Sequence, residues 1–211
     1  MKRNGPQAAT LYTPAGKRKY LTRTERTAFI AAAELHPRPE VGTLCLLIAY
    51  TGCRLSEALA VTARAIEPDA GFVALHSLKK RTSDAVIREV PIPDGLLDRI
   101  ERVHAVSRLG ADERLWRFSR CRAWQLVKEV IAQAGISKGI HATPKGLRHG
   151  FGINAVQSDV PLTLVQRWLG HARLETTAIY LNATGAEERA LAARMWEGRS
   201  ATAERFPVRQ S

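Results

Sequence analysis

A basic segment in the C-terminal half of the chain has the residue types of an anion-binding site. Residues 143–152 read TPKGLRHGFG, with threonine as the expected N-cap of a helix and proline at its first position. The free backbone N–H groups at such a helix start favour anions. Lys145 and Arg148 are three residues apart and share a face near that end. The segment predicts a phosphate site, with a solvated basic helix end as the alternative.

Two further side chains could take part in acid–base or nucleophilic chemistry. His171 directly follows Gly170, which is expected to stop a short helix begun at Pro161 and to hold the imidazole at the edge of a cleft. Tyr180 lies nine residues further on, in a short helical segment. A phenol can act as a nucleophile once its proton is removed. Taken singly, a structural histidine and a packed aromatic ring are the alternatives.

Three short motifs, found in a fixed order along the chain, favour the chemical interpretation of these residues over the structural one. They are TGCRLSE at 51–57, LRH at 147–149 and LGH at 169–171, the last followed by TTAIY at 176–180. In these motifs the chain, over about residues 20–182, resembles the tyrosine recombinase (phage integrase) family. The resemblance implies an α+β, mainly helical fold with a small antiparallel sheet or hairpin. It also implies a site-specific DNA recombinase that cuts and rejoins DNA in integration, excision or inversion.

By this resemblance, Arg54 and Arg148 clamp the scissile phosphate and His171 adds a hydrogen bond. Tyr180 attacks phosphorus in line, which gives a 3′-phosphotyrosyl link and a free 5′-hydroxyl. The residue types suit this chemistry, because planar guanidinium groups bind the oxygens on which charge grows during phosphoryl transfer. Since the covalent link conserves the energy of the phosphodiester, the implied reaction needs neither a cofactor nor a metal.

The resemblance also places a proton donor in the turn of the hairpin, where this chain has Lys79, Lys80 and Arg81. Lys79 is preferred as the general acid for the leaving 5′-oxygen, and Lys80 is its close rival. Lys80 and Arg81 are expected to bind the DNA backbone, although a solvated basic hairpin is the alternative. Glu57, three residues after Arg54, is expected to orient that arginine, unless it is an ordinary surface charge.

One position departs from the family's pattern. Where the family usually has a histidine three residues before its second arginine, this chain has Lys145. A lysine can donate to a phosphate oxygen, but it is a poor proton acceptor near neutral pH unless desolvated. His149 should point about 100° away from Arg148 around the helix and support the fold. The predicted catalytic set is Arg54, Lys79, Lys145, Arg148, His171 and Tyr180.

Local patterns predict the elements that position these residues. A capping box at 22–25 opens a helix that runs to Leu35, and an apolar run at 41–50 predicts a buried helix. A third helix begins at Arg54, and two strands of a hairpin are expected at 72–78 and 86–92. Further helices are expected at about 95–108, 121–135, 144–157, 161–169, 174–182 and 186–197.

Three parts are expected along the chain: a flexible basic arm at 1–19, a catalytic domain at 20–185, and a C-terminal helix and tail at 186–211. The tail is expected to pack on its own domain or on a neighbouring protomer. Most family members carry an additional N-terminal helical domain, so the chain resembles a catalytic domain alone. Exchange of two duplexes takes four strand cuts, which predicts a homo-tetramer on two DNA segments, with accessory DNA-bending proteins as candidate partners.

Composition limits the partners and the compartment. The 32 Lys and Arg residues against 20 Asp and Glu residues give a net charge of +12, which favours double-stranded DNA as the partner. With no apolar run of about 20 residues and no secretory signal, the chain is expected away from membranes, in the cytoplasm with the nucleoid. Cys45, Cys53 and Cys121 are odd in number and lack CxxC spacing, which predicts buried free thiols.

Two other functions stay open at this level. A type IB topoisomerase would use the same arginines, lysine and tyrosine to relax supercoils, and only motif context and spacing favour a recombinase. A non-catalytic DNA-binding accessory protein could share the fold, but the complete set of predicted catalytic residues argues against it.

Overall fold

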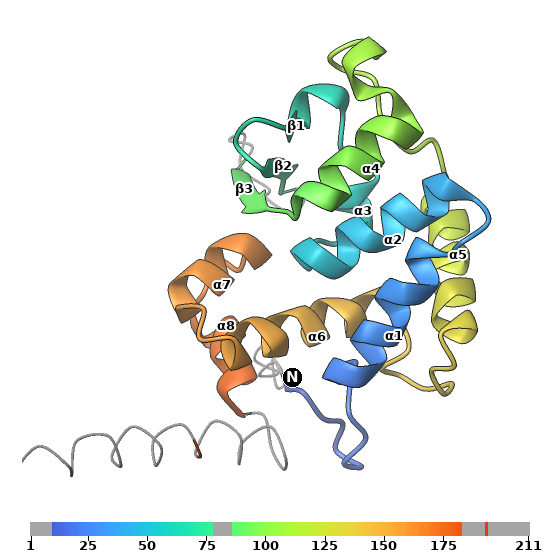
Figure 1. Cartoon of the computed structure of the whole chain (residues 1–211). Coiled ribbons are helices and arrows are strands. Elements are labelled where there is room, and N and C mark those ends of the chain that lie inside the picture. The colour runs from blue at the N-terminus through green and yellow to red at the C-terminus, as the bar shows by residue number, and fades with distance from the viewer. Residues whose placement is uncertain (1–9, 78–85, 183–192, 194–211) are drawn as a thin grey trace, which may run out of the picture.

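The computed structural model describes residues 10–77, 86–182 and 193, and these form a mainly helical fold with one small sheet (Figure 1). The α+β prediction is confirmed. The α-helices are α1 (Arg23–Glu34), α2 (Pro39–Thr51), α3 (Leu55–Ala58), α4 (Asp94–His104), α5 (Arg120–Gln133), α6 (Pro144–Gln157), α7 (Leu162–Leu169) and α8 (Glu175–Ala178). Short 3-10 helices cover Ala63–Ala65, Val106–Arg108 and Ile179–Asn182.

The sheet has three antiparallel strands in the order β1 (Ile66–Glu67), β2 (Phe72–His76) and β3 (Ile87–Pro91). The predicted hairpin is therefore present, with Val73 opposite Val90 and Leu75 opposite Arg88. Strand β1 was not predicted, because two residues are too few for an alternating pattern. Alternation along β3 buries Arg88 and Val90 and exposes the residues between and beside them.

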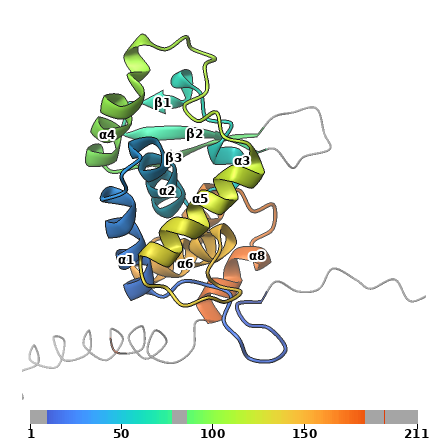
Figure 2. The ribbon, with the colours of Figure 1, turned by 90° about the vertical axis from the view of Figure 1, so that its right-hand side faces the viewer.

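Helix α2 forms the centre of the main core. Ten of its 13 residues are buried, as its nearly continuous apolar sequence predicts. Figure 1 shows it between the sheet with α4 on one side and α6 on the other, and Figure 2 shows α5 lying across α2, α3 and α6. A second apolar cluster joins α6, α7 and the segment of Tyr180. The functional motifs lie where these two cores meet.

The start of the described chain differs from the loose arm expected for residues 1–19. Leu11 is only 4% exposed and belongs to the second cluster, and Tyr12 forms a β-bridge with Arg18. Arg18 also makes two hydrogen bonds of 2.5 Å to Glu25. Residues 10–19 are therefore docked on the domain through one buried leucine and one ion pair. The sequence did not predict this docking, because the segment is too short to show a hydrophobic period. Residues 1–9 lie outside the described part.

Other predictions can be compared with the structure element by element. The capping box of Thr22 and Glu25 is present. The helix expected at 95–108 is interrupted at Ala105, whose φ of 50° ends α4. Of the helix expected at 186–197, only residue 193 is described. Cys45 and Cys53 are buried free thiols as predicted, whereas Cys121 is exposed. No helix of the described ranges is long and apolar enough to cross a membrane.

Candidate active site

Arg148 is held rigidly at the first turns of α6. The helix starts as predicted, because Thr143 Oγ1 accepts the backbone N–H of Gly146 at 3.1 Å and Pro144 follows the cap. The guanidinium of Arg148 is only slightly exposed, and it donates to the carbonyls of Gly52 at 2.7 Å and Leu169 at 2.6 Å. Two carbonyls from distant segments thus fix its plane, while other N–H groups are left for an anion.

The charge of Arg148 survives its burial. Desolvation, followed by the repulsion of the neighbouring Arg54, lowers the pKa of Arg148 to about 10. This value is still well above neutral pH, so Arg148 keeps its positive charge. Arg54 repels the charge of Arg148, and a phosphate bound between the two groups would offset this repulsion.

Arg54 is oriented by Glu57, as the motif at 51–57 suggests. Its Nη1 donates to Glu57 Oε1 at 2.6 Å, and its backbone N–H donates to Oε2 at 2.9 Å. The Glu57 side chain is 1% exposed, whereas that of Arg54 is 28% exposed. Burial alone would raise the pKa of Glu57, but hydrogen bonds and charge from Arg88, together with those from Arg54, hold it below its ordinary value. The carboxylate is therefore a fixed anchor for Arg54.

Sequence reasoning missed Arg88, which also binds this carboxylate. Its Nη2 donates to Glu57 Oε2 at 2.5 Å, and its Nε donates to the carbonyl of Trp168 at 2.7 Å. The sequence could have predicted that Arg88 is buried, because it alternates with Val90 and Ile92 on the apolar face of the strand. An arginine on the inner face of a small sheet needs buried partners.

His171 lies at the end of α7 in the place predicted for it. Gly170 has a φ of 63° and ends the helix, and the backbone N–H of His171 returns to the carbonyl of Gln166 at 3.1 Å. The Nδ1 of His171 is 2.9 Å from the hydroxyl oxygen of the buried Thr177. Burial, and then the charges of Arg148 and Arg54, lower the pKa of His171 to about 3. The imidazole is neutral at physiological pH.

Tyr180 is 1% exposed and stacks on His171, with ring centroids 6.3 Å apart and an interplanar angle of 19°. The ring packs against Gly152, where a Cβ atom would lie 2.5 Å from it. Burial raises the pKa of Tyr180 to about 12, although the charges of Arg148 and Arg54 act in the opposite direction. The phenol of Tyr180 is therefore protonated at neutral pH.

His149, which was expected to support the fold, makes a contact with Tyr180 that the sequence did not predict. The Nδ1 of His149 is 3.2 Å from the Tyr180 hydroxyl oxygen. Burial, and then the charge of Lys145, lower the pKa of His149 to about 4. A neutral imidazole can accept the phenolic hydrogen bond. His149 supports the fold as expected, but it does so at the oxygen of the candidate nucleophile.

The folded chain thus brings four of the predicted residues together from separate segments: Arg54 before α3, Arg148 in α6, His171 after α7 and Tyr180 after α8. This arrangement agrees with a comparison against protein families, in which the phage integrase family matches residues 19–187. The chain belongs to the phage integrase family.

Among curated relatives of this phage integrase domain is the tyrosine recombinase XerD of Neisseria meningitidis serogroup B. It is 34% identical over 146 residues, which cover 64% of this chain and 47% of XerD. The tyrosine recombinase XerA of Thermococcus kodakarensis is 30% identical over 181 residues, which cover 81% of this chain and 60% of XerA. The chain spans about half the length of these relatives.

Solved structures show the same fold. The catalytic domain of bacteriophage HP1 integrase matches 82% of this chain and 93% of its own, with a TM-score of 0.59 and 21% identity. XerH recombinase bound to its difH substrate matches 88% of this chain and 59% of its own, with a TM-score of 0.66 and 21% identity. The described fold is therefore that of tyrosine recombinase catalytic domains.

The other predicted site residues of this integrase-family chain are less fully defined. Lys79, Lys80 and Arg81 lie outside the described residues. Lys145 is exposed on the first turn of α6, and its charge is felt by His149. An exposed ammonium in this place can meet a phosphate that approaches Arg148.

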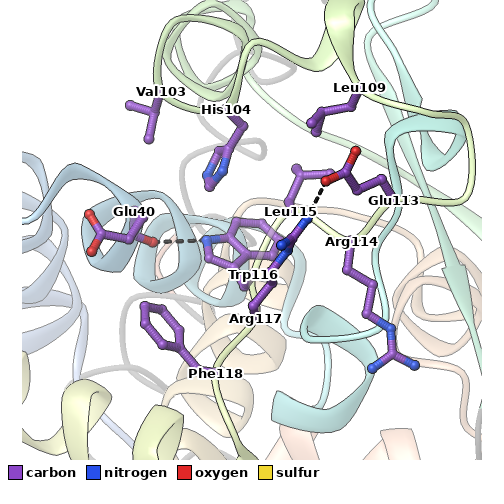
Figure 3. A pocket seen from close by; sticks show the side chains of 10 residues that line it. All are labelled: Glu40, Val103, His104, Leu109, Glu113, Arg114, Leu115, Trp116, Arg117 and Phe118. Atoms are coloured by element: carbon purple, nitrogen blue, oxygen red, sulfur yellow. Dashed lines mark hydrogen bonds and ion pairs between the residues drawn. The ribbon is translucent and has the colours of Figure 1, made fainter.

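A pocket also lies away from these residues, between the start of α2 and the end of α4 (Figure 3). Trp116 forms its floor and donates to the carbonyl of Glu40 at 2.8 Å. Arg117 and Glu113 pair at its rim, and His104 stands edge-on to the indole. None of the predicted catalytic residues lines this pocket, so it is separate from the integrase motifs.

Proposed function

We propose that this phage integrase family chain is the strand-cutting part of a site-specific DNA recombinase, in which Tyr180 becomes joined to a DNA 3′-phosphate. One observation carries the proposal. Buried partners hold the guanidinium groups of Arg54 and Arg148. Both guanidinium groups lie near enough to Tyr180 for their charges to lower its pKa. An anionic phosphodiester bound between the two arginines would lie next to the phenol of Tyr180, which can act as a nucleophile once its proton is removed.

The two arginines supply electrostatic stabilisation. In-line attack on phosphorus raises negative charge on the equatorial oxygens, and preorganised cationic donors stabilise that charge without further rearrangement. Arg148 is fixed by two carbonyls, and Arg54 is fixed by Glu57. Neither has to move far when DNA arrives. Exposed Lys145 is suited to a further contact with the same phosphate.

His171 is suited to donate a hydrogen bond to one of these oxygens. When the Thr177 hydroxyl donates to Nδ1 of His171, the proton of the neutral ring sits on Nε2, and Nε2–H becomes the free donor. The lowered pKa of His171, about 3, keeps the ring in this neutral state. His171 is thus a hydrogen-bond donor to the transition state and carries no charge of its own.

Proton transfers complete the reaction. Tyr180 must lose its proton as it attacks, because a pKa of about 12 leaves almost no phenolate at neutral pH, and we assign this proton to a water molecule beside the bound phosphate. The 5′-oxygen leaves as a hydroxyl once it receives a proton, and we assign this role to Lys79, with Lys80 as its rival. Lys80 and Arg81 would hold the adjacent DNA backbone.

The wider proposal follows from the family and from the net charge of +12. Double-stranded DNA is the partner, and four copies of the chain act on two DNA segments, with accessory DNA-bending proteins as further partners. Residues 20–185 form the catalytic unit, and residues 186–211 connect protomers. The protein acts in the cytoplasm, at the nucleoid, in integration, excision or inversion.

The test uses a duplex selected for binding from random sequences, with a nick placed at successive positions so that a cut fragment can diffuse away. The proposal expects a complex resistant to denaturing detergent, in which the 3′ end of the cut strand is attached to protein. The released strand should carry a 5′-hydroxyl that a polynucleotide kinase can label. A 5′-linked protein, or cuts with free 3′ ends only, would contradict the proposal.

A further inference from the structure

A buried arginine joins the two halves of the candidate site. Arg88 belongs to β3, where strand alternation turns it inward beside Val90, and it is 5% exposed in the folded chain. Figure 1 shows β3 next to α7, the helix that leads to His171. Arg88 is therefore placed between the segment that carries Arg54 and the segment that carries His171, yet it is too buried to touch DNA itself.

The first contact of Arg88 acts on Arg54. Nη2 of Arg88 donates to Glu57 Oε2 at 2.5 Å, and the same carboxylate accepts from Nη1 and the backbone N–H of Arg54. Without Arg88, one oxygen of a carboxylate that is 1% exposed would lose its charged partner. The carboxylate could then rotate or bind a proton, and Arg54 would lose a fixed anchor.

The second contact acts on the end of α7. The last carbonyls of a helix lack partners within the helix and carry the negative end of its dipole. Arg88 Nε donates to the Trp168 carbonyl at 2.7 Å, and Arg148 Nη2 donates to the Leu169 carbonyl at 2.6 Å. Two buried guanidinium groups therefore hold the helix end directly before Gly170 and His171.

The remaining part of the Arg88 guanidinium is costly to bury. A Cβ atom on Gly170 would lie 3.1 Å from Nη1 of Arg88, so the group is pressed against the turn before His171. This Nη1 is buried and has no hydrogen-bond partner within residues 10–77, 86–182 and 193. A buried donor without a partner lowers the stability of the fold. Proteins keep such destabilising features mainly at functional sites, which favours a functional role for Arg88.

We propose that Arg88 is a positioning residue for strand cleavage. Through Glu57 it holds the guanidinium of Arg54, and through the Trp168 carbonyl it holds the helix end that presents His171. The inference rests on the proposed function, since it assigns to Arg88 a role in the same phosphate site. A purely structural arginine would affect only the stability of the fold.

Arg99 offers a matched control for that structural role. Its Nη2 donates at 2.6 Å to the carbonyl of Glu34, the last residue of α1. Its Nε, like Nη1 of Arg88, is buried without a partner among the described residues. Arg99 therefore caps a helix end in a similar way, but it has no contact with Glu57, Arg54 or the turn at His171.

The experiment compares Arg88→Met, Arg88→Lys and Arg99→Met with the unmodified chain. Single-turnover cleavage of the nicked, selected duplex should fall about 10-fold to 100-fold in Arg88→Met, the range expected when a supporting contact of a catalytic group is lost. The cleavage rate of Arg88→Lys should lie between those of Arg88→Met and the unmodified chain, because one ammonium group cannot bind Glu57 and the Trp168 carbonyl with the geometry of a guanidinium. Arg99→Met should cleave within about twofold of the unmodified rate even where its thermal unfolding temperature falls.

A second readout does not depend on cleavage. Relaxation of the 15N nucleus of Arg54 Nε reports how rigidly the guanidinium is held, and Arg88→Met should make this group more mobile while Arg99→Met should not. If Arg88→Met does not fold, Arg88→Lys provides the same comparison, because it keeps a cation next to Glu57.

The outcomes separate the two proposals. An Arg54 group that stays equally rigid in a folded Arg88 variant overturns the inference, and so does cleavage within twofold of the unmodified rate. An Arg54 group that loosens, in a chain whose unmodified form yields no DNA adduct, supports the positioning contact and contradicts the proposed recombinase function instead.

Discussion

The two halves of the candidate site are prepared to different degrees. In the proposed phosphate-binding half, Arg54 and Arg148 are fixed by buried acceptors, and the side chain of Arg54 is 28% exposed. In the nucleophile half, Tyr180 is 1% exposed, has its pKa raised to about 12 and lies within hydrogen-bonding distance of His149. Under the proposed function, the phosphate-binding groups are in place while the candidate nucleophile is still buried. We therefore propose that DNA binding draws Tyr180 out of its packed position.

The largest effect is expected in the prepared half. Arg148→Ala and Arg54→Ala should each lower single-turnover cleavage by about 10²–10³-fold, the usual result of losing one preorganised donor to a developing oxyanion. Binding to the selected duplex, measured by fluorescence anisotropy, should change much less, because many other cations contact the backbone. A loss of cleavage below tenfold would remove that arginine from the site.

A smaller effect is expected from crowding the nucleophile. Gly152→Ala would put a methyl group 2.5 Å from the Tyr180 ring, and should reduce cleavage by about 10-fold to 100-fold because the displaced ring pushes His171, on which it stacks, out of place. The overpacking should also lower the free energy of unfolding by about 1–3 kcal/mol in urea titrations. Gly95→Ala is the control, since its added methyl group would meet nothing within 4 Å. Equal cleavage by the two variants would mean that the packed position of Tyr180 is irrelevant to catalysis.

A still smaller effect on cleavage is expected for the partner of the resting hydroxyl. His149→Ala removes a hydrogen bond that has to break before Tyr180 reaches phosphorus, so cleavage should change by less than about tenfold while the free energy of unfolding falls by about 1–3 kcal/mol. Urea titration and single-turnover cleavage measure the two quantities on the same protein. A loss as large as that of Arg148→Ala would place His149 in the chemistry and remove the contrast between the halves.

The smallest effect is expected from pH. The pKa values of His171, about 3, and His149, about 4, lie below the ordinary value of 6.5, so both rings stay neutral from pH 5.5 upward and would gain a proton only in strong acid. The cleavage rate measured from about pH 5.5 to 8 should therefore show no inflection near 6.5. An acid limb with that midpoint, lost in His171→Ala or in His149→Ala, would identify a histidine that titrates during the reaction.

Local chemistry explains which features could be predicted from the sequence. The caps at Thr22 and Thr143 and the stop at Gly170 depend on neighbouring residues alone, and all three were predicted. The pairing of Arg54 with Glu57 also follows from their spacing. The contact of Arg88 with Glu57 joins residues 31 positions apart, and that of His149 with Tyr180 joins another pair 31 positions apart. Such contacts depend on how α3, β3, α6 and the 3-10 helix at Ile179–Asn182 pack, which no local pattern reveals.

The identity of the nucleophile is the central claim, and mass mapping of the DNA adduct tests it most directly. The chain has four tyrosines, Tyr12, Tyr20, Tyr50 and Tyr180. After reaction with the nicked duplex, digestion by trypsin and nuclease should leave a nucleotide 3′-phosphate on the peptide that contains Tyr180. Tyr180→Phe should give no adduct while binding DNA nearly as well as the unmodified chain. An adduct on another residue, or one that persists in Tyr180→Phe, would contradict the account.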